Sequence, residues 1–332
     1  MLKADLFMTN RHSFFRPLLC LLALIVLNSS AFAEPLHLEL QSRVPVASGS
    51  DEFRIVKKSE SWEPSRTAII VCDMWDLHSC LNAVRRVQQM APRMNQLLEV
   101  ARSNGVFIIH APSDCMKAYA GHPARLRAQQ APLAANLPPD MSRKACKKIP
   151  SEEGAEFNLS QIAANADDDP VAHANWAAAL KAKGLKPQAP WTREIHTLRI
   201  DDADAISDSG VEIWNLLEAR GITNVILMGV HLNVCICARP FGLRQMRKNG
   251  KHVVLMRDLT DSMYSPKDWP YVDHYRGTAL FVEYIEKYIA PTITSDQILG
   301  GRPFIFKGDP GKGQESAPKI NPPKNAGVQS SG

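Results

Sequence analysis

The sequence predicts an α/β protein with three layers, in which a mostly parallel sheet carries helices on both faces. Short apolar runs of strand length alternate along the chain with longer segments whose apolar residues recur every three or four positions. Two of the runs, 67–72 and 224–228, are almost continuously apolar, as is typical of strands buried on both faces. Strands that alternate with helices require right-handed crossovers, which place helices over both faces of the sheet.

The positions of the helices and strands are predicted from the spacing of apolar residues and from the residues that favour turns. The helix that begins near Val84 contains Pro92, which is expected to kink or divide it, and Asn104-Gly105 is expected to end it. The first strand pattern, 53–56, is expected to pair with a sheet edge. The expected strands are 53–56, 67–72, 106–110, 196–200, 224–228 and 252–256, and the expected helices are 84–101, 173–183, 211–220, 235–249 and 274–288.

The chain begins with the pattern of a secretory signal peptide, residues 1–33. Arg11 and Arg16 precede a short uncharged apolar run, and Ser30-Ala31-Phe32-Ala33 offers a small-residue cleavage site. The apolar run is too short for a comfortable membrane span, although an uncleaved N-terminal anchor is the alternative. We therefore expect an exported protein, periplasmic or secreted, without an integral membrane segment after signal cleavage.

The rest of the chain divides into three parts. Residues 34–65 form a mixed polar N-terminal extension, and 66–306 form one α/β domain. Residues 111–190, rich in Ala, Pro, Asp and Lys, are expected to be an insertion that covers the strand ends. Residues 307–332 have almost no apolar content, which predicts a disordered tail.

Charge and cysteine content limit the function classes. The net charge of +5 is modest and no basic stripe interleaved with aromatic residues occurs, so no nucleic-acid partner is expected. Six cysteines remain after signal cleavage, and export permits disulfides. Cys115 and Cys146 flank a loop-rich segment and are the first choice for a bridge, although sequence alone does not fix the connectivity.

Cys235 is the main candidate nucleophile. It follows the strand 224–228 and a sharp turn, in the first turn of the helix expected over 235–249. Unpaired backbone N–H groups and the positive end of the helix dipole lower a thiol pKa in that setting. Cys237 is a rival, but a helix turns by more than half a circle over two residues, so both thiols cannot face one pocket. The alternative for Cys235 is a buried thiol that packs as a small hydrophobic side chain.

Several polar residues follow the carboxyl ends of the expected strands, where ligands bind in open α/β sheets. Asp73 ends the strand 67–72, His110 ends the next strand, and Asp258 follows the strand 252–256. The turn 229–235 follows another strand. Asp73 beside apolar Met74 and Trp75 would be partly desolvated, and the raised pKa would suit a general base.

The segment Gly229-Val230-His231-Leu232-Asn233-Val234-Cys235 resembles the G-V-x-T-x-x-C signature of isochorismatase-like cysteine hydrolases, which include the nicotinamidases. Residues 67–75 resemble the first strand of that family, which ends in a catalytic Asp. The resemblance covers roughly Arg66 to Tyr288. Leu232 departs from it, because the family usually has Thr there.

The resemblance implies an activity. A small-molecule substrate, an amide, would be cleaved at its C–N bond through a thioester on Cys235, with Asp73 as base. The backbone N–H groups of Val234 and Cys235 would stabilise the oxyanion, and a cis peptide would lie in the Gly-Val-x segment. No cofactor is required by this chemistry. The family is often oligomeric, so the resemblance also allows a homo-oligomer.

The third catalytic residue departs from the family. Family members carry Lys at the end of the strand before the helix 211–220, whereas residues 198–204 here contain no lysine and several acidic residues. Arg199 would supply a positive charge but no proton, and His231 would supply both, so His231 joins Asp73 and Cys235 as a catalytic candidate. The alternative function is a non-catalytic small-molecule-binding protein on the same fold.

The remaining candidates concern substrate and metal. The side chains expected to contact the substrate are Trp75, His78, His110 and Arg239. Arg239 lies one turn beyond Cys235 and would steady a thiolate or a substrate carboxylate. Asp76, His78 and Cys80 alternate, so in an extended loop they would point to one side and offer ligands to a divalent metal. Related nicotinamidases bind a metal with an Asp-x-His pair and a further His, a pattern that these positions match only in part.

Overall fold

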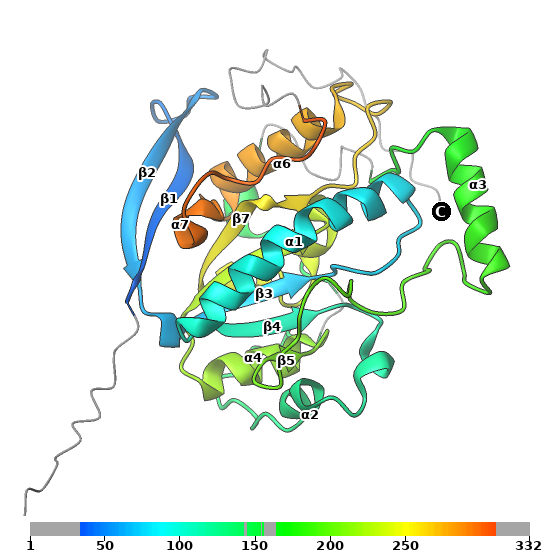
Figure 1. Ribbon diagram of the computed structural model, residues 1–332. Helices are drawn as coiled ribbons and strands as arrows, with labels where there is room; N and C mark the ends of the chain where they lie inside the picture. Colours follow the sequence, from blue (N-terminus) through cyan, green and yellow to red (C-terminus); the bar gives the residue numbers. More distant parts are fainter. Residues whose placement is uncertain (1–33, 143–144, 154, 156–163, 310–332) are drawn as a thin grey trace, which may run out of the picture. The chain divides into compact units, whose positions relative to one another are not determined.

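The computed structural model describes residues 34–142, 145–153, 155 and 164–309. Its centre is an eight-stranded sheet with the strand order β2-β1-β8-β7-β6-β3-β4-β5 (Figure 1). The strands are β1 (Leu36–Pro45), β2 (Phe53–Trp62), β3 (Thr67–Cys72), β4 (Phe107–Ala111), β5 (Ala205–Ile206), β6 (Asn224–Val230), β7 (His252–Asp261) and β8 (Thr292–Ile293). The predicted signal peptide and most of the predicted tail lie outside the described residues.

The sheet is mostly parallel. Strand β3 runs parallel to β4 and β6, and the parallel pairing continues outward to β5 on one side and through β7 to β8 on the other. The extension that precedes β3 forms β1 and β2, which pair with each other in antiparallel fashion, and β1 also pairs antiparallel with β8. The strand predicted over 53–56 is therefore one arm of a longer hairpin.

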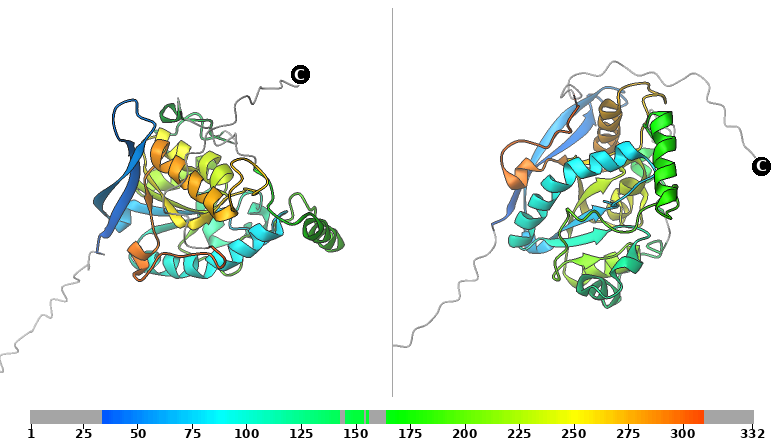
Figure 2. Two further views of the ribbon diagram at one scale, coloured as in Figure 1. Left: turned by 90° about the horizontal axis from the view of Figure 1, so that it is seen from above. Right: turned by 45° about the vertical axis from the view of Figure 1, so that its right-hand side comes forward.

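Helices cover both faces of the sheet (Figure 2). Helix α1 (Leu81–Ser103) packs on the face to which Ile69 and Val71 of β3 point. Helices α2 (Pro123–Gln129), α4 (Gly210–Ala219), α5 (Leu243–Lys248) and α6 (His274–Tyr288) pack on the other face, which receives Ile70 and Cys72. The alternation along β3 divides the core into two apolar layers, so the predicted three-layer α/β fold is confirmed.

Most expected elements are present, but two differ for identifiable reasons. Residues 196–200 form no strand, because the chain turns there with Leu198 N–H donating to the Ile195 carbonyl at 3.0 Å. The outermost parallel strand is β5, a few residues later. Pro92 lies inside one continuous helix, since buried neighbours such as Met90 and Met94 anchor α1 on both sides of it.

The helix expected over 235–249 is divided. A single π-helical turn, η5 (Leu232–Ile236), holds Cys235, and α5 begins only at Leu243. Pro240 between them cannot continue a helix, because it lacks an N–H and its ring clashes with the preceding turn. Cys235 therefore lies in a short turn between strand and helix, and not at the start of a long helix.

The insertion contributes little regular structure. Within it lie η2 (Met116–Tyr119), α2, η3 (Pro150–Glu152) and α3 (Pro170–Ala182). Helix α7 (Asp296–Leu299) follows β8, and η1 (Pro64–Arg66) precedes β3. In the part of the chain that the structure describes, no helix combines the length and apolar character that crossing a membrane requires.

Candidate active site

Asp73 lies directly after β3 and is completely buried. Its backbone has φ +49°, in the left-handed region that Asp tolerates better than most residues. The backbone N–H of Ser113, in the loop after β4, donates to Asp73 Oδ1 at 2.8 Å. A non-glycine residue held in this conformation is often part of a functional site, because the surroundings must enforce it.

Cys235 faces Asp73 from η5. Its side chain is nearly covered, with 8% of the residue exposed, and its thiol and the Asp73 carboxylate are close enough to shift each other's pKa. The close approach of β6 to β3 makes this contact possible: Gly229 has φ +113°, and a Cβ there would lie 2.1 Å from the Cys72 carbonyl oxygen. Only glycine fits at that position, so the turn that carries Cys235 starts against the residue before Asp73.

Arg239 completes the group. Its Nε and Nη2 atoms both lie 3.2 Å from Asp73 Oδ2. Its backbone N–H donates to the Cys235 carbonyl at 2.9 Å, which places the guanidinium one turn beyond the thiol. Arg239 was expected to contact the thiolate or the substrate, and its partner in the structure is the carboxylate of the candidate base. Arg199, the other arginine considered, has 64% of its side chain exposed and pairs with Asp201.

Burial dominates the protonation of this group. It raises the pKa of the Asp73 carboxyl, against the opposing effects of Arg239, the Cys235 thiol and Ser113. Burial and the neighbouring Asp73 charge raise the pKa of the Cys235 thiol, and Arg239 offsets only part of that. The sequence-based expectation of a lowered thiol pKa is therefore wrong for this arrangement. The short η5 turn supplies little helix dipole, and the thiol has little water around it.

His231 does not carry the positive charge that the missing lysine would supply. It lies just before η5 and is 3% exposed. Burial lowers its pKa far below the ordinary value, and the neighbouring His78 lowers it further. Its Nε2 atom has no hydrogen-bond partner among the described residues. A neutral imidazole with an unpaired buried nitrogen is suited to binding a polar group.

His110, at the end of β4, is enclosed between two carboxylates. Its Nδ1 lies 2.7 Å from Glu194 Oε2, and its Nε2 lies 3.3 Å from Asp204 Oδ2. Burial lowers its pKa, but the charges of Glu194 and Asp204 outweigh burial and raise that pKa to about 9. Both ring nitrogens are occupied, so the imidazole has none to offer the substrate for which it was proposed. Asp204 comes from the acidic segment that replaces the family's lysine.

Aromatic rings lie beside the loop that follows Asp73. Trp75 stacks on Trp191 with ring centroids 4.4 Å apart, and His78 stacks 5.9 Å from Trp191. The His78 and His231 rings are 4.8 Å apart. Burial lowers the pKa of His78 to about 4, so this imidazole is also neutral. Trp75, Trp191, His78 and His231 thus form one contiguous, largely buried aromatic cluster. Trp191 was not predicted from the sequence as part of the site.

The backbone around Cys235 fits the family resemblance in part. The peptide between Val230 and His231 is cis, as the resemblance implies. The N–H of Val234 donates to the His231 carbonyl at 3.0 Å, so this expected oxyanion donor is already engaged. The Cys235 N–H is the other donor that the resemblance suggests.

Comparison with known proteins found similarity only at low sequence identity. No protein-family model and no curated protein matches the sequence. Among solved structures, a cysteine hydrolase from Pseudomonas syringae pv. phaseolicola 1448A is similar at 17% identity over 71% of this chain and 92% of that chain, with a TM-score of 0.42.

Two further solved structures are similar to a comparable degree. An isochorismatase from Pseudomonas putida KT2440 matches at 10% identity over 70% of this chain and 89% of that chain, with a TM-score of 0.39. N-carbamoylsarcosine amidase from Thermoplasma acidophilum matches at 14% identity over 70% of this chain and 97% of that chain, with a TM-score of 0.34. These likenesses assign no chemistry to this chain, whose site is therefore interpreted from its own residues.

The alternating Asp76, His78 and Cys80 do not fit a shared cation. Both carboxylate oxygens of Asp76 accept hydrogen bonds from Thr192, and the Cys80 thiol donates to Asp167 and Asp168. Ligand atoms of Cys80, Asp167 and Asp168 do lie within 4.8 Å of one another. The two carboxylates, however, already accept hydrogen bonds from Arg86 and from the backbone N–H groups at the start of α1. The two carboxylates of this group are therefore already hydrogen-bonded within the protein.

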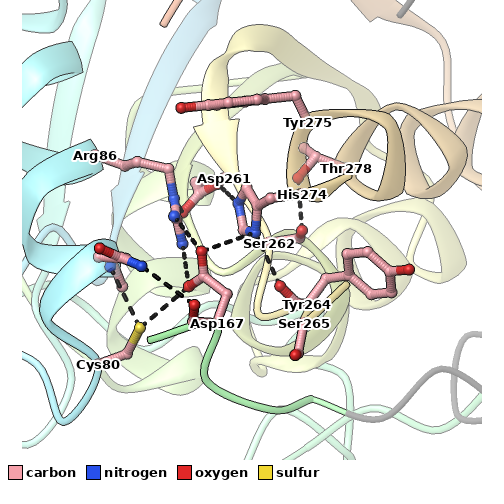
Figure 3. Close-up of polar contacts among 12 residues, drawn as sticks. Cys80, Arg86, Asp167, Asp261, Ser262, Tyr264, Ser265, His274, Tyr275 and Thr278 are labelled. Carbon is pink, nitrogen blue, oxygen red and sulfur yellow. Dashed lines mark hydrogen bonds and ion pairs between the residues drawn. The ribbon is translucent and has the colours of Figure 1, made fainter. Parts of the chain in front are cut away.

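A second buried polar cluster lies at the end of β7 (Figure 3). Arg86 of α1 bridges two carboxylates, Asp261 and Asp167, at 2.7 Å each, and His274 Nε2 lies 2.8 Å from Asp261 Oδ1. This cluster ties the insertion, through Asp167, to α1 and α6. Sequence pattern did not predict it, because the strand was expected to end at Met256 and Asp258 was expected at the rim. Asp258 instead accepts hydrogen bonds from Ser295 and Phe304.

The cysteines that the structure describes carry no disulfide. All six described cysteines are free, including Cys115 and Cys146, so the expected bridge is wrong. The two thiols have different surroundings: Asp76 and Asp73 raise the pKa of Cys115 after burial, whereas Lys248 and Arg244 are the charges beside Cys146.

Proposed function

We propose that this chain is a cysteine hydrolase that cleaves the C–N bond of a small amide through a thioester on Cys235. The observation that carries the proposal is the placement of the Cys235 thiol beside the buried Asp73 carboxylate, whose two oxygens are held by Arg239 and by the Ser113 N–H. A nucleophile within hydrogen-bond reach of a base, which a third group orients, is the arrangement that covalent catalysis needs.

The steps of the proposed reaction follow from the protonation states of the Cys235 thiol and the Asp73 carboxylate. In the resting enzyme the thiol holds its proton and Asp73 is the acceptor. As the sulfur attacks the carbonyl carbon, the S–H proton passes to Asp73, so the thiolate never accumulates. Asp73 then gives that proton to the leaving amine, the C–N bond breaks, and a thioester remains. A water molecule, deprotonated by Asp73, hydrolyses the thioester and returns the proton to sulfur.

Arg239 supplies charge to this cycle but no proton. It favours the ionised form of Asp73 and opposes burial, which favours the protonated form. A guanidinium stays charged at any working pH, so proton movement is assigned to Asp73 alone. This differs from a lysine-containing site, in which the third residue can also titrate. The reaction calls for no cofactor or metal, and the aromatic cluster that includes Trp75, His78 and His231 is assigned to substrate contact.

A panel of small primary carboxamides, with ammonia release as the readout, tests the activity on the full chain. Cys235→Ala and Asp73→Asn should each abolish release, whereas Cys237→Ala should leave it unchanged because that thiol is buried beside Arg244 and Glu152. Activity that survives Cys235→Ala but not Cys237→Ala would show that the wrong cysteine is assigned. We also propose export of the protein, on the basis of residues 1–33, which cell fractionation tests.

A second function is favoured by one observation, the raised pKa of the Cys235 thiol. A protein that only binds a small molecule on this fold needs no reactive sulfur. Alkylation of Cys235 by iodoacetamide across pH separates the two functions. In a hydrolase, alkylation at neutral pH should be faster in the wild type than in Asp73→Asn, because the carboxylate accepts the proton. Equal rates, together with no turnover of any amide, would favour the binding protein.

A further inference from the structure

One carboxylate oxygen beside the candidate active site is buried and unpaired. Glu194 is 3% exposed, and its Oε1 atom has no hydrogen-bond partner among the described residues. Its other oxygen, Oε2, lies 2.7 Å from His110 Nδ1. A buried polar atom without a partner costs stability, and native proteins leave few of them. Glu194 Oε1 therefore calls for a hydrogen-bond donor from outside the chain.

Backbone pairing fixes the direction of the Glu194 side chain. Trp75, in the loop after β3, is directly opposed to Glu194 in an antiparallel bridge. Beside it, the Ile195 N–H donates to the Met74 carbonyl at 2.7 Å. Opposed residues of an antiparallel pair project their side chains to the same side, with Cβ atoms close together. The Glu194 carboxylate and the Trp75 indole are therefore on the same side of this pair.

Trp75 is in turn held next to the candidate base. Its Nε1 donates to the Ser113 carbonyl at 3.0 Å, and the Ser113 N–H donates to Asp73 Oδ1 at 2.8 Å. A single residue, Ser113, thus contacts both the indole that neighbours Glu194 and the carboxylate assigned to proton transfer. The unpaired oxygen and the reacting groups are positioned by this short framework.

The surroundings of the unpaired oxygen suit a cationic donor. Trp75 stacks on Trp191 with ring centroids 4.4 Å apart, and an indole attracts a cation within about 6 Å of its centroid. A carboxylate also binds a cationic donor more strongly than a neutral one. Burial raises the pKa of Glu194, and the positive His110 opposes that rise. A cation at Oε1 would favour the ionised carboxylate further.

We propose that Glu194 selects amides that carry a primary ammonium group one or two carbon atoms from the scissile carbonyl, with Oε1 accepting a hydrogen bond from that ammonium. The separation is short because Trp75 and Asp73 are held by the same residue, Ser113. This inference rests on the proposed function, since it names the substrate class of the same site. His110 is a positioning residue, which holds Oε2 and leaves Oε1 for the substrate.

The test uses two pairs of amides that match in size and differ in charge: glycinamide with propionamide, and β-alaninamide with butyramide. Binding to the full-length Cys235→Ala protein is measured by isothermal titration calorimetry near neutral pH. We expect each amino amide to bind about 10- to 100-fold more tightly than its uncharged match, as a hydrogen bond to a charged group implies. Adding Glu194→Gln should abolish this preference and leave the binding of the uncharged amides unchanged.

Two further variants separate recognition from damage to the fold, and each variant is first checked by its thermal melting curve. Glu194→Asp keeps the negative charge and should retain part of the preference. Glu212→Gln changes a carboxylate that Arg125 and Ser207 already engage, so it should retain the whole preference. The comparison within each amide pair needs no variant of Glu194, so it decides on the ammonium even if Glu194→Gln does not fold.

The inference is overturned if both members of each pair bind equally, or if none of the four amides binds. A preference that survives Glu194→Gln, or one that Glu212→Gln removes, overturns it too. Ammonia release from the same four amides is measured with the wild type. Preferential binding without release refutes the proposed function alone, and release at equal rates from both members of each pair refutes this inference alone.

Discussion

Replacement of Arg239 by glutamine removes the only arginine that contacts Asp73 among the described residues. Both contacts, at 3.2 Å, are to Oδ2 of a carboxylate with no exposed surface. Loss of a hydrogen bond to a charged group costs about 1.5–3 kcal/mol, and breaking a fully buried ion pair costs about 3–5 kcal/mol. Because 27% of the Arg239 side chain is exposed, the lower values apply. We expect the free energy of unfolding to fall by about 2–3 kcal/mol near neutral pH.

The pH dependence of that loss identifies its cause. Burial already raises the pKa of Asp73 in the folded protein, and removal of the guanidinium raises it further. A carboxyl whose folded pKa exceeds its unfolded value makes the protein less stable as pH rises between the two values. The variant is therefore expected to resemble the wild type at acidic pH, where Asp73 is protonated in both, and to lose stability progressively as the pH rises.

Urea denaturation at several pH values measures this effect, and two controls define it. In an Asp73→Asn background, Arg239→Gln should cost little, because the charge to be neutralised is gone. Arg247→Gln, at an exposed position on α5, should change the free energy of unfolding by less than about 0.5 kcal/mol. A loss that is the same at every pH, or that persists in the Asp73→Asn background, would mean that Arg239 stabilises the fold by packing and not by pairing with Asp73.

Three further predictions concern the surrounding structure. Glu194 and Asp204 outweigh burial and raise the pKa of His110 to about 9. The stabilising effect of protonated His110 is therefore complete below the unfolded pKa of about 6.5 and is lost as pH rises through about 9. The melting temperature should fall across that window in the wild type but not in His110→Gln. Gly229→Ala should lower the free energy of unfolding by about 4 kcal/mol or more in denaturation experiments, since the new Cβ would lie 2.1 Å from a carbonyl oxygen. Gly105→Ala, where a Cβ would have nothing within 4 Å, should lower it by only about 1 kcal/mol because of the backbone conformation. Asp168→Ala should cost about 1–2 kcal/mol, because Asp168 accepts hydrogen bonds from the Leu81 and Asn82 N–H groups at the start of α1, and equal stability of variant and wild type would contradict that role.

The fold was predictable where local pattern and burial agree. Strands β3 and β6 are continuous apolar runs, and α6 begins and ends where its periodic pattern does, so period alone located them. The strand predicted over 196–200 is absent because the alternating residues there form a turn, in which only Leu198 is buried. Periodicity records which side chains are apolar, but it does not record which backbone hydrogen bonds the chain makes.

Of the candidate site, only the approach of Asp73 and Cys235 to each other could be predicted from the sequence. Asp73 and Cys235 follow strands that neighbour each other in the sheet, so topology alone brings them together. Which charged side chains contact Asp73 and Cys235 depends on how side chains from distant loops are oriented, and residue spacing in the sequence does not reveal that. Arg239 was assigned to the substrate and His231 to the missing charge, whereas tertiary packing paired the arginine with Asp73 and buried the histidine as a neutral ring.

The two ends of the eight-stranded sheet bear on how this protein avoids aggregation. An unpaired strand edge is a template for another chain, and both edges here are poor templates. At one end β5 has only two residues, Ala205 and Ile206. At the other end β2 is long, but its sequence FRIVKKSESW places charged side chains along it, among them Lys57 and Lys58. A strand from another chain that added at β5 would find only two residues to pair with, and one that added at β2 would meet charged side chains. The β1–β2 hairpin therefore lengthens the sheet and also protects that edge from pairing with another chain.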